Sequence, residues 1–224
     1  MSKPYASSVQ EVLLKFQTSE KGLSDDEVKK RLQKYGRNVL EEKRRSKIAI
    51  FFAQFHNILI YILMLASLVT AFAGKWTDFT AIVFMILLNG IIGFVEEVRA
   101  EASIEALKKM TETREHVIRN GSIVKVFSSD IVPGDIIKFN EGDAVTADIR
   151  LVDSNALFMD ESSLTGESLP VDKDSNAVFD ENTQPFDQKN MLFSGTSVVK
   201  GEGLGIVVAT GKQSYFAKIV YAGK

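Results

Sequence analysis

The longest pattern in the chain is an uncharged, apolar run from residue 48 to residue 74. A second uncharged run, from 79 to 95, follows the short polar sequence KWTD. A helix needs about 20 mostly apolar residues to cross the hydrocarbon of a bilayer. Neither run has the polar stripe that a helix at the edge of a soluble core keeps. The pattern therefore predicts two membrane helices, at about 48–73 and 76–96; the alternative is a buried helical hairpin in a soluble protein.

Basic residues flank this pair of runs and are sparse between them. Lys75 lies in the connecting turn, whereas the flanks carry Lys43, Arg44, Arg45, Lys47, Arg99, Lys108 and Lys109. Since cytoplasmic flanks carry the excess of Lys and Arg, we expect an integral cell-membrane protein with both termini in the cytoplasm. The polar residues Gln54, His56 and Asn57 fall near the inner end of the first run, so we interpret them as interfacial rather than as an ion site.

The stretch before the first run has the pattern of soluble helices. One helix is predicted over residues 9–16. A second begins after Ser24, which forms a capping-box pattern with Glu27, and it stops at Gly36. This N-terminal segment, residues 1–46, carries no chemistry of its own.

After the second run the pattern changes from helical to β. Good helix formers continue to Met110 and predict a stalk. Alternating apolar positions then recur between turn residues, beginning with a hairpin at Asn120-Gly121. They predict a small antiparallel β-sandwich or jelly roll from about 113 to 211, followed by a helix at 214–222. The expected fold is an α+β membrane protein with three parts: N-terminal helices (1–46), a transmembrane hairpin (47–98) and a stalk with a β domain (99–224).

Composition narrows the possible functions. The formal net charge of −2 gives no reason to expect nucleic acid as a partner. Because the 224 residues include no cysteine, disulfides, thiolate metal sites and cysteine nucleophiles are excluded. With His56 and His116 as the two histidines, a histidine-rich metal centre is excluded as well.

One glycine-rich stretch resembles a phosphate-binding loop but departs from its spacing. In GEGLGIVVATGKQS, five residues rather than four separate Gly205 from Gly211, and Gln213 stands in place of Ser or Thr. We interpret its glycines as turn residues and GIVVAT as a strand.

The sequence MDESSLTGESLP, residues 159–170, is the stronger candidate for chemistry. Gly166 allows a backbone to approach a ligand closely, and the carboxylate of Glu167 can orient or deprotonate a water. The residues by themselves fit an ordinary turn between two strands equally well.

The order of these pieces resembles the P-type cation-transporting ATPases. The sequence GLSDDEVKKRLQKYGRNVL is similar to their N-terminal segment, and residues 48–95 are similar to their first two membrane helices. Residues from about 100 to 215, with VPGDII, GDAVTADIRLV and DESSLTGESLPV, are similar to their actuator domain, which implies a jelly-roll-like β fold. The resemblance covers nearly the whole chain.

This resemblance implies a role for Thr165-Gly166-Glu167-Ser168, the TGES loop. In the family the loop moves onto a phosphorylated aspartate of another domain, and its glutamate, here Glu167, positions the water that hydrolyses the aspartyl phosphate. Thr165, Gly166 and Ser168 are then expected to shape the loop. Asp160 and Glu161 are expected to hold its strand and its partner surfaces.

The family's phosphorylated aspartate lies in a DKTGT sequence, which does not occur in these 224 residues. We therefore expect no cofactor or metal site in this chain, and ATP and Mg²⁺ for the complete pump. The expected partners are the lipid bilayer and the polypeptide region that carries the phosphorylation and nucleotide-binding domains, with no nucleic acid.

Two hypotheses follow from the resemblance. The first is the N-terminal portion of an ATP-driven cation pump that contributes to dephosphorylation. The alternative is a stand-alone actuator-like membrane protein that regulates an intact pump, or a truncated remnant, without enzymatic activity. NMLFSGTSVVKG is similar to the calcium and sodium/potassium branch, so calcium is the first expected ion and proton or sodium the next.

Overall fold

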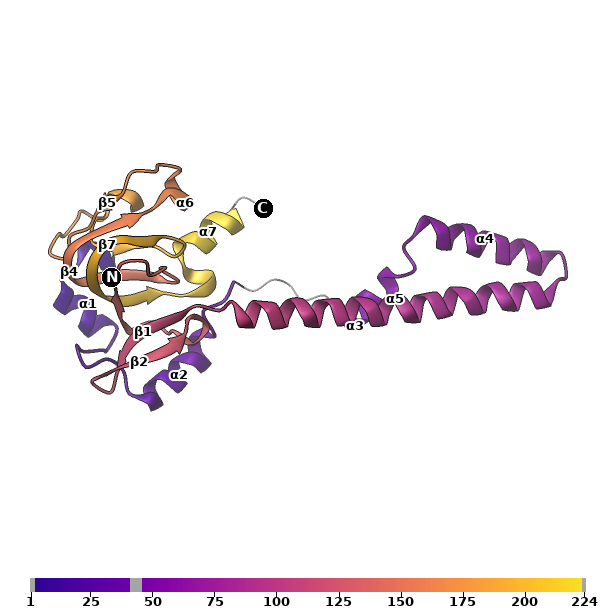
Figure 1. Cartoon of the computed structure of the whole chain (residues 1–224), viewed down its shortest axis with the longest axis horizontal. Helices are drawn as coiled ribbons and strands as arrows, with labels where there is room; N and C mark the ends of the chain where they lie inside the picture. The colour runs from indigo at the N-terminus through magenta and orange to yellow at the C-terminus, as the bar shows by residue number, and fades with distance from the viewer. Residues whose placement is uncertain (1–2, 41–45, 223–224) are drawn as a thin grey trace. The chain divides into compact units, whose positions relative to one another are not determined.

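The computed structural model describes residues 3–40 and 46–222, which fall into two compact units (Figure 1). One unit contains residues 1–41 and 112–224, and the other contains 42–111. The N-terminal helices thus belong to the same unit as the β domain, although the apolar runs separate them in sequence. Lys43, Arg44 and Arg45, on which the predicted orientation partly rests, lie outside the described residues.

Three helical elements begin the first unit: η1 (Pro4–Ala6), α1 (Val9–Lys15) and α2 (Asp25–Tyr35). The predicted ends of α2 are confirmed, because the Ser24 side chain accepts a hydrogen bond from Glu27 N and Gly36 follows with a φ of 77°. The Glu27 carboxylate accepts a hydrogen bond from Arg31 Nε at 2.9 Å, rather than completing the predicted capping box.

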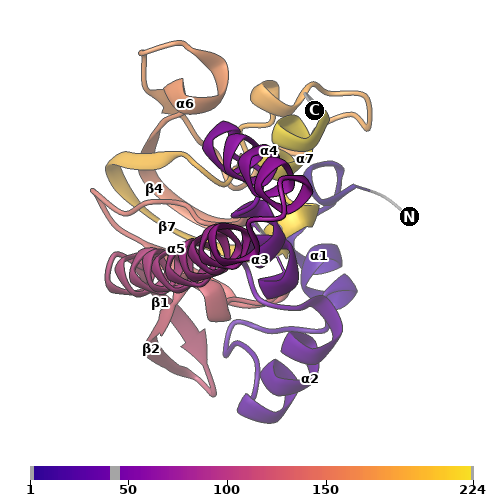
Figure 2. The same cartoon turned by 90° about the vertical axis from the view of Figure 1, so that its right-hand side faces the viewer.

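The N-terminal helices pack on one side of the β strands (Figure 2). A capping box between Ser8 and Glu11 starts α1, and the sequence analysis missed it. Val12 of α1 is fully buried against Ile136 and Ile206 of the sheet. This packing explains why the N-terminal segment and the β domain form one unit.

Within the described residues, the strands form one antiparallel sheet in the order β2-β1-β3-β7-β4-β5, with β6 also paired to β4. Their bounds are β1 (Arg114–Arg119), β2 (Ser122–Phe127), β3 (Ile136–Phe139), β4 (Asp148–Asp160), β5 (Val171–Asp172), β6 (Met191–Leu192) and β7 (Ser197–Ala209). The expected antiparallel β domain is confirmed. Its main core cluster consists of fully buried apolar side chains that include Val117, Ile137, Phe139, Ile149, Leu151, Leu157, Met159 and Val207.

The predicted hairpin around Asn120-Gly121 is confirmed. These residues join β1 to β2 with φ values of 51° and 76°, and Arg119 pairs with Ser122. Two consecutive positive φ values are the geometry of a type I′ turn, for which Asn-Gly is the favoured sequence.

The glycines of residues 201–205 lie in β7, so their interpretation as turn residues is wrong, whereas the strand over GIVVAT is confirmed up to Ala209. A Cβ atom on Gly205 would lie 2.2 Å from Ile149 Cγ2 of the neighbouring strand β4. The glycine therefore permits the close approach of two strands rather than a turn.

Short helical elements complete this unit: η2 (Ser128–Asp130), α6 (Ser162–Thr165), η3 (Pro185–Asp187), η4 (Gly211–Gln213) and α7 (Tyr215–Ala222). The last of these corresponds to the helix predicted at 214–222. Among them, α6 follows β4 and ends with Thr165, the first residue of the TGES loop.

The second unit contains α3 (Lys47–Ala53), α4 (Ile58–Phe72) and α5 (Trp76–Met110). The first apolar run was predicted as a single helix, and this is wrong, because α3 and α4 are bent by 66° at a break. The side chain of Asn57 accepts a hydrogen bond from Leu59 N and so starts α4 anew. Asn57, one of the three polar residues that we interpreted as interfacial, is therefore the N-cap of a second helix.

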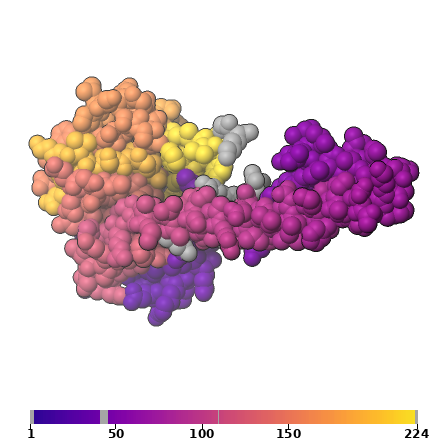
Figure 3. Space-filling view, turned by 45° about the vertical axis from the view of Figure 1, so that its right-hand side comes forward, coloured from indigo at the N-terminus to yellow at the C-terminus, as the bar shows by residue number. Residues whose placement is uncertain are grey.

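The second apolar run and the predicted stalk form one continuous helix, α5 (Figure 1). Figure 3 shows the side chains of this helix in space-filling form. Its residues 76–108 are long and apolar enough to cross a membrane. Among the described residues, no other single helix is long and apolar enough to cross a membrane. The bent pair α3 and α4 is a second candidate if the two helices are counted as one span.

Candidate functional site

The TGES loop follows the C-terminal end of β4, on a short helical turn that projects from the sheet (Figures 1 and 2). The backbone carbonyl of Glu161 accepts hydrogen bonds from Leu164 N at 2.9 Å, from Thr165 N at 3.0 Å and from Thr165 Oγ1 at 3.0 Å. Together with the bond from Gly166 N to Ser162 O, they make the turn α6. Three hydrogen bonds of the turn therefore share one acceptor, Glu161 O.

Gly166 ends this turn in the left-handed region. Its φ is 77° and its ψ is −1°, and its N–H donates to Ser162 O at 2.9 Å. A Cβ atom at this position would meet nothing within 4 Å. Glycine is thus required here by the backbone conformation and not by lack of space.

Thr165 links the turn to the next residue. Its Oγ1 accepts a hydrogen bond from Glu167 N at 3.1 Å while it donates to Glu161 O. Glu167 and Ser168 are exposed, and so is the side chain of Leu169, at 80%. Within the described residues, no hydrogen bond or ion pair engages the Glu167 carboxylate. The backbone N–H of Glu167 is therefore fixed by Thr165, whereas the Glu167 carboxylate faces solvent.

The four predicted site residues therefore lie on one exposed loop, but they do not form an enclosed pocket. Their neighbour Asp160 accepts a hydrogen bond from Ser162 N at 2.9 Å. Hydrogen bonds from the side chain and then the backbone of Ser162 lower the pKa of Asp160. The ionised carboxylate of Asp160 thus stabilises the start of α6.

Glu161, in contrast, turns into the protein. Its Oε1 lies 2.6 Å from Lys173 Nζ, and both side chains are buried. Burial lowers the pKa of Lys173, and the negative charge of Glu161 opposes this change. Sequence reasoning named Glu161 but missed Lys173, which follows β5 and shares no short motif with the TGES loop.

Ser163 is a second residue that sequence reasoning missed. Its Oγ donates a hydrogen bond to Gly195 O at 2.6 Å and so ties α6 to the segment between β6 and β7. Nothing in the sequence around Ser162-Ser163 indicates that one of the two serines would bind the backbone of Gly195.

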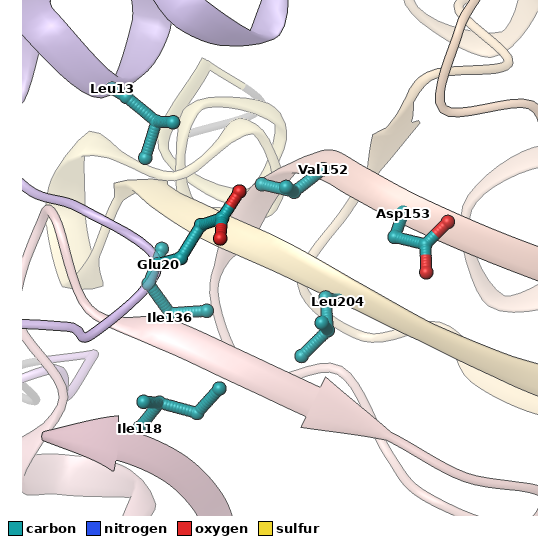
Figure 4. Close-up of a pocket in the computed structure, with 7 residues that line it drawn as sticks. All are labelled: Leu13, Glu20, Ile118, Ile136, Val152, Asp153 and Leu204. Atoms are coloured by element: carbon teal, nitrogen blue, oxygen red, sulfur yellow. The ribbon is translucent and has the colours of Figure 1, made fainter. Parts of the chain in front are cut away.

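A groove of about 470 Å³ elsewhere in the same unit offers less chemistry. It is lined by Leu13, Glu20, Ile118, Ile136, Val152, Asp153 and Leu204 (Figure 4). Glu20 reaches over the groove from the segment after α1, whereas Asp153 lies on β4, apart from Glu20 (Figure 4). The floor is apolar and the two carboxylates do not converge, so the TGES loop remains the candidate site.

No group of three or more His, Asp or Glu side chains that could hold a metal ion occurs in residues 3–40 and 46–222.

Comparisons with known families match two stretches of the chain, one at each end. Residues 109–223 match the P-type ATPase actuator domain, and residues 4–70 match the N-terminus of the cation transporter/ATPase family.

Individual relatives agree with these matches. A calcium-transporting ATPase of Bacillus subtilis is 43% identical over 88% of this chain and 22% of its own length. Calcium-transporting ATPase 1 of Bacillus cereus is 39% identical over 98% of the chain and 25% of its own length. Sodium/potassium exporting P-type ATPase 1 of Saccharomyces cerevisiae is 39% identical over 88% of the chain and 18% of its own length.

The chain thus spans a quarter or less of the length of these relatives. The actuator match alone covers more than half of the residues, from 109 to 223, and it includes the TGES loop. The chain therefore belongs to the membrane-integral P-type cation-transporting ATPases and carries the N-terminal segment and the actuator domain of that family.

Proposed function

We propose that this chain acts as the membrane-anchored actuator portion of an ATP-driven cation pump. In this proposal Glu167 positions the water that hydrolyses an aspartyl phosphate held by another domain. The observation that carries the proposal is the exposed carboxylate of Glu167 on a turn whose backbone is fixed by Thr165 and Glu161. Thr165, Gly166 and Ser168 shape the approach of this loop.

The chemistry suits a single carboxylate. Hydrolysis of an acyl phosphate needs a water aligned with the breaking P–O bond, and a carboxylate that accepts a proton from this water accelerates attack. General-base catalysis of this kind typically contributes roughly 10²- to 10⁴-fold to a rate. An exposed loop serves this purpose because the reacting phosphate arrives from a partner domain rather than from a pocket of this chain.

We place the anchor in the second unit. The bent pair α3 and α4 forms the first span, α5 forms the second, and both ends of the chain face the cytoplasm. This assignment gives three functional parts: residues 1–46, the hairpin 47–98, and the stalk with the actuator domain 99–224. Support comes from the apolar side chains of α4 and α5 that remain exposed, among them Leu65, Val69, Phe84 and Ile91.

The orientation can be tested by labelling, since the chain contains no cysteine. Lys75→Cys, in the turn between α4 and α5, should react with an impermeant maleimide added to intact cells. Lys125→Cys, exposed on β2, should react only after the membrane is opened. Equal labelling of both positions in intact cells, or release of the chain by alkaline washing, would contradict the proposed topology.

Calcium is the cation that we propose, because two of the relatives described above are named calcium-transporting ATPases. The complete pump would use ATP and Mg²⁺, which supply the phosphoryl group and its counter-charge. Uptake of radioactive calcium into vesicles that contain the complete pump tests this choice, with sodium uptake and proton movement as the competing outcomes.

The catalytic role is tested in the pump formed by this chain with the region that carries the phosphorylated aspartate. The enzyme is labelled with radioactive ATP, and decay of the acid-stable phosphoprotein is followed after a chase. Glu167→Gln should slow this decay by roughly 10²-fold or more. Glu141→Gln, an exposed carboxylate on a different turn, is the matched control and should leave the decay unchanged.

Unchanged decay in Glu167→Gln would remove Glu167 from the proposed role. If the chain forms no phosphorylated complex with any such region and instead alters the rate of an intact pump, the regulatory alternative is the better function.

A further inference from the structure

We infer that Glu161 and Lys173 form a buried clamp that positions the TGES loop. This inference deepens the proposed function, since the loop is the element that would reach the phosphate. The two residues are positioning residues, because their side chains are buried and make no contact with the exposed carboxylate of Glu167.

The clamp closes the base of the loop. Glu161 directly follows β4 and Lys173 directly follows β5, so they stand at the two ends of the connection that contains residues 162–172. The strands pair between Lys173 and the loop, with Phe158 opposite Asp172 and Met159 opposite Val171. Lys173 N also donates to Leu157 O at 2.9 Å. The distance of 2.6 Å between Glu161 Oε1 and Lys173 Nζ therefore joins the first residue of the loop to the far end of this paired segment.

The position of Glu161 is transmitted to the loop through its backbone. The carbonyl oxygen of Glu161 accepts three of the hydrogen bonds that build α6, and Ser162 O accepts another from Gly166 N. Thr165 Oγ1, which makes one of them, in turn accepts the N–H of Glu167. A rotation of Glu161 would therefore displace the acceptor on which the turn depends, and Glu167 would move with it.

The energetics favour positioning over simple stabilisation. Lys173 and Glu161 are 0% and 1% exposed at the side chain, and within the described residues their charged atoms meet as an ion pair without a hydrogen-bond partner. Removing two charges from water costs so much that an apolar pair of similar volume is often as stable or more stable. Such a pair would fill the space equally well but would not fix the direction of the contact. The ion pair is thus best explained by the geometry that it imposes on the loop.

Hydrogen exchange of the full chain in detergent micelles tests the inference without any pump. The double variant Glu161→Gln with Lys173→Met keeps the buried volume and removes both charges. In this variant the amides of Thr165 and Gly166 should exchange at least about tenfold faster. The amide of Val207, which donates to Asp135 O at 2.9 Å in the β core, should exchange at the same rate as before.

A merely structural pair would give a different pattern. If loop and core amides accelerate together, the pair stabilises the domain as a whole and the inference is wrong. Unchanged exchange at Thr165 and Gly166 overturns it as well.

Conservative substitution at Lys173 supplies a further readout. Lys173→Arg retains the cation and should keep the loop amides protected, whereas Lys173→Met alone should expose them. Equal loss of protection in both variants, with Val207 unaffected, would show that the charge is not what holds the loop.

This result is independent of catalysis. Glu167→Gln should leave the exchange of Thr165 and Gly166 unchanged, because its carboxylate makes no hydrogen bond within the described residues. If Glu167→Gln does not slow phosphoprotein decay, the proposed function is refuted, but the inference that Glu161 and Lys173 position the loop is unaffected. Failure of the exchange experiment would refute the clamp alone.

Discussion

Arg119 of β1 binds the carboxylate of Asp135 with two hydrogen bonds, from Nε to Oδ1 at 2.9 Å and from Nη2 to Oδ2 at 2.6 Å. Both side chains are buried. The same carboxylate accepts Val132 N at 2.9 Å, and Arg119 Nη2 also donates to Asp130 O at 3.0 Å. The Val-Pro-Gly-Asp turn is therefore a packed structural element between η2 and β3, fastened to the strand beside it.

Breaking this pair should destabilise the β domain strongly. Asp135→Asn leaves the buried guanidinium of Arg119 without its counter-charge, and the loss of one partner of a buried pair typically costs about 3–5 kcal/mol. Hydrogen exchange of the Val207 amide measures the loss. Glu202→Gln is the matched control, because the Lys138–Glu202 pair in the same sheet is exposed and 3.6 Å long. This control should change stability by less than about 1 kcal/mol, and an equal effect of both substitutions would contradict the argument.

Gly134 gives a second prediction for the same turn. Its φ is +96°, and a Cβ atom would lie 2.0 Å from Arg31 Nη1, which donates to Pro133 O at 2.7 Å. Gly134→Ala should therefore impose backbone strain of about 1–2 kcal/mol and also displace Arg31. Gly142→Ala isolates the strain, since Gly142 has a φ of +89° and open space around its Cβ position.

The difference in urea unfolding between these two alanine variants measures the contact between α2 and the turn. Loss of the hydrogen bond from Arg31 should make Gly134→Ala worse by about 1–3 kcal/mol. Equal destabilisation of the two variants would show that Arg31 adapts without cost.

Local patterns predicted the elements whose cause is local. The Asn120-Gly121 turn and the Ser24 cap were predicted because each depends on residues that are neighbours in sequence. The TGES loop could be located from its residues, but composition and spacing did not establish it as a site, because an exposed glycine turn after a strand is a common sequence.

Features that depend on distant partners were missed. A lysine is rarely buried without a partner, so the sequence around Lys173 predicts a solvated side chain. Its partner, Glu161, lies at the other end of the loop and is not evident from the sequence. The break between α3 and α4 was missed because hydropathy does not reveal that Asn57 would cap a new helix. Tertiary context thus hid the role of Lys173, whereas the Asn57 cap is local and was hidden by the uncharged run around it.

Arg150 is another buried charge that gives a testable prediction. It is 1% exposed and donates hydrogen bonds to backbone carbonyl groups of Pro4, Ser7, Leu151, Ser175 and Ala177. Burial lowers its pKa to about 10. The guanidinium therefore fastens the N-terminal segment to β4 through its fork of donors.

Arg150→Lys should destabilise the domain by roughly 3 kcal/mol, because an ammonium group cannot reach carbonyls on three separate segments and leaves some of them unpaired. Limited proteolysis should then release the segment around Pro4 before the rest of the domain unfolds. Arg114→Lys, an exposed arginine that lies 4.6 Å over the ring of Phe127, is the control and should cost less than about 1 kcal/mol. Unfolding without earlier cleavage near Pro4 would contradict the fastening role.

Glu115 should make the β domain less stable as pH rises. Burial raises the pKa of Glu115 from its ordinary value of 4.5 to about 7, while the hydrogen bond from Thr146 Oγ1 at 3.0 Å lowers it. Between these two pH values the folded state holds a proton that the unfolded state has released. Since the unfolded state then binds fewer protons, the free energy of unfolding falls from about pH 4.5 to about pH 7.

Glu115→Gln should remove this loss, because the amide oxygen still accepts from Thr146 but carries no charge. At pH 8 the variant should be more stable than the parent chain by up to roughly 3 kcal/mol. Burial also raises the pKa of Asp148, to about 6, so a residual slope should persist below that pH. Urea unfolding across pH 5–8 separates the two groups, since the slope between about pH 6 and 7 belongs to Glu115. An unchanged slope in that interval would show that Glu115 is already ionised in the folded domain.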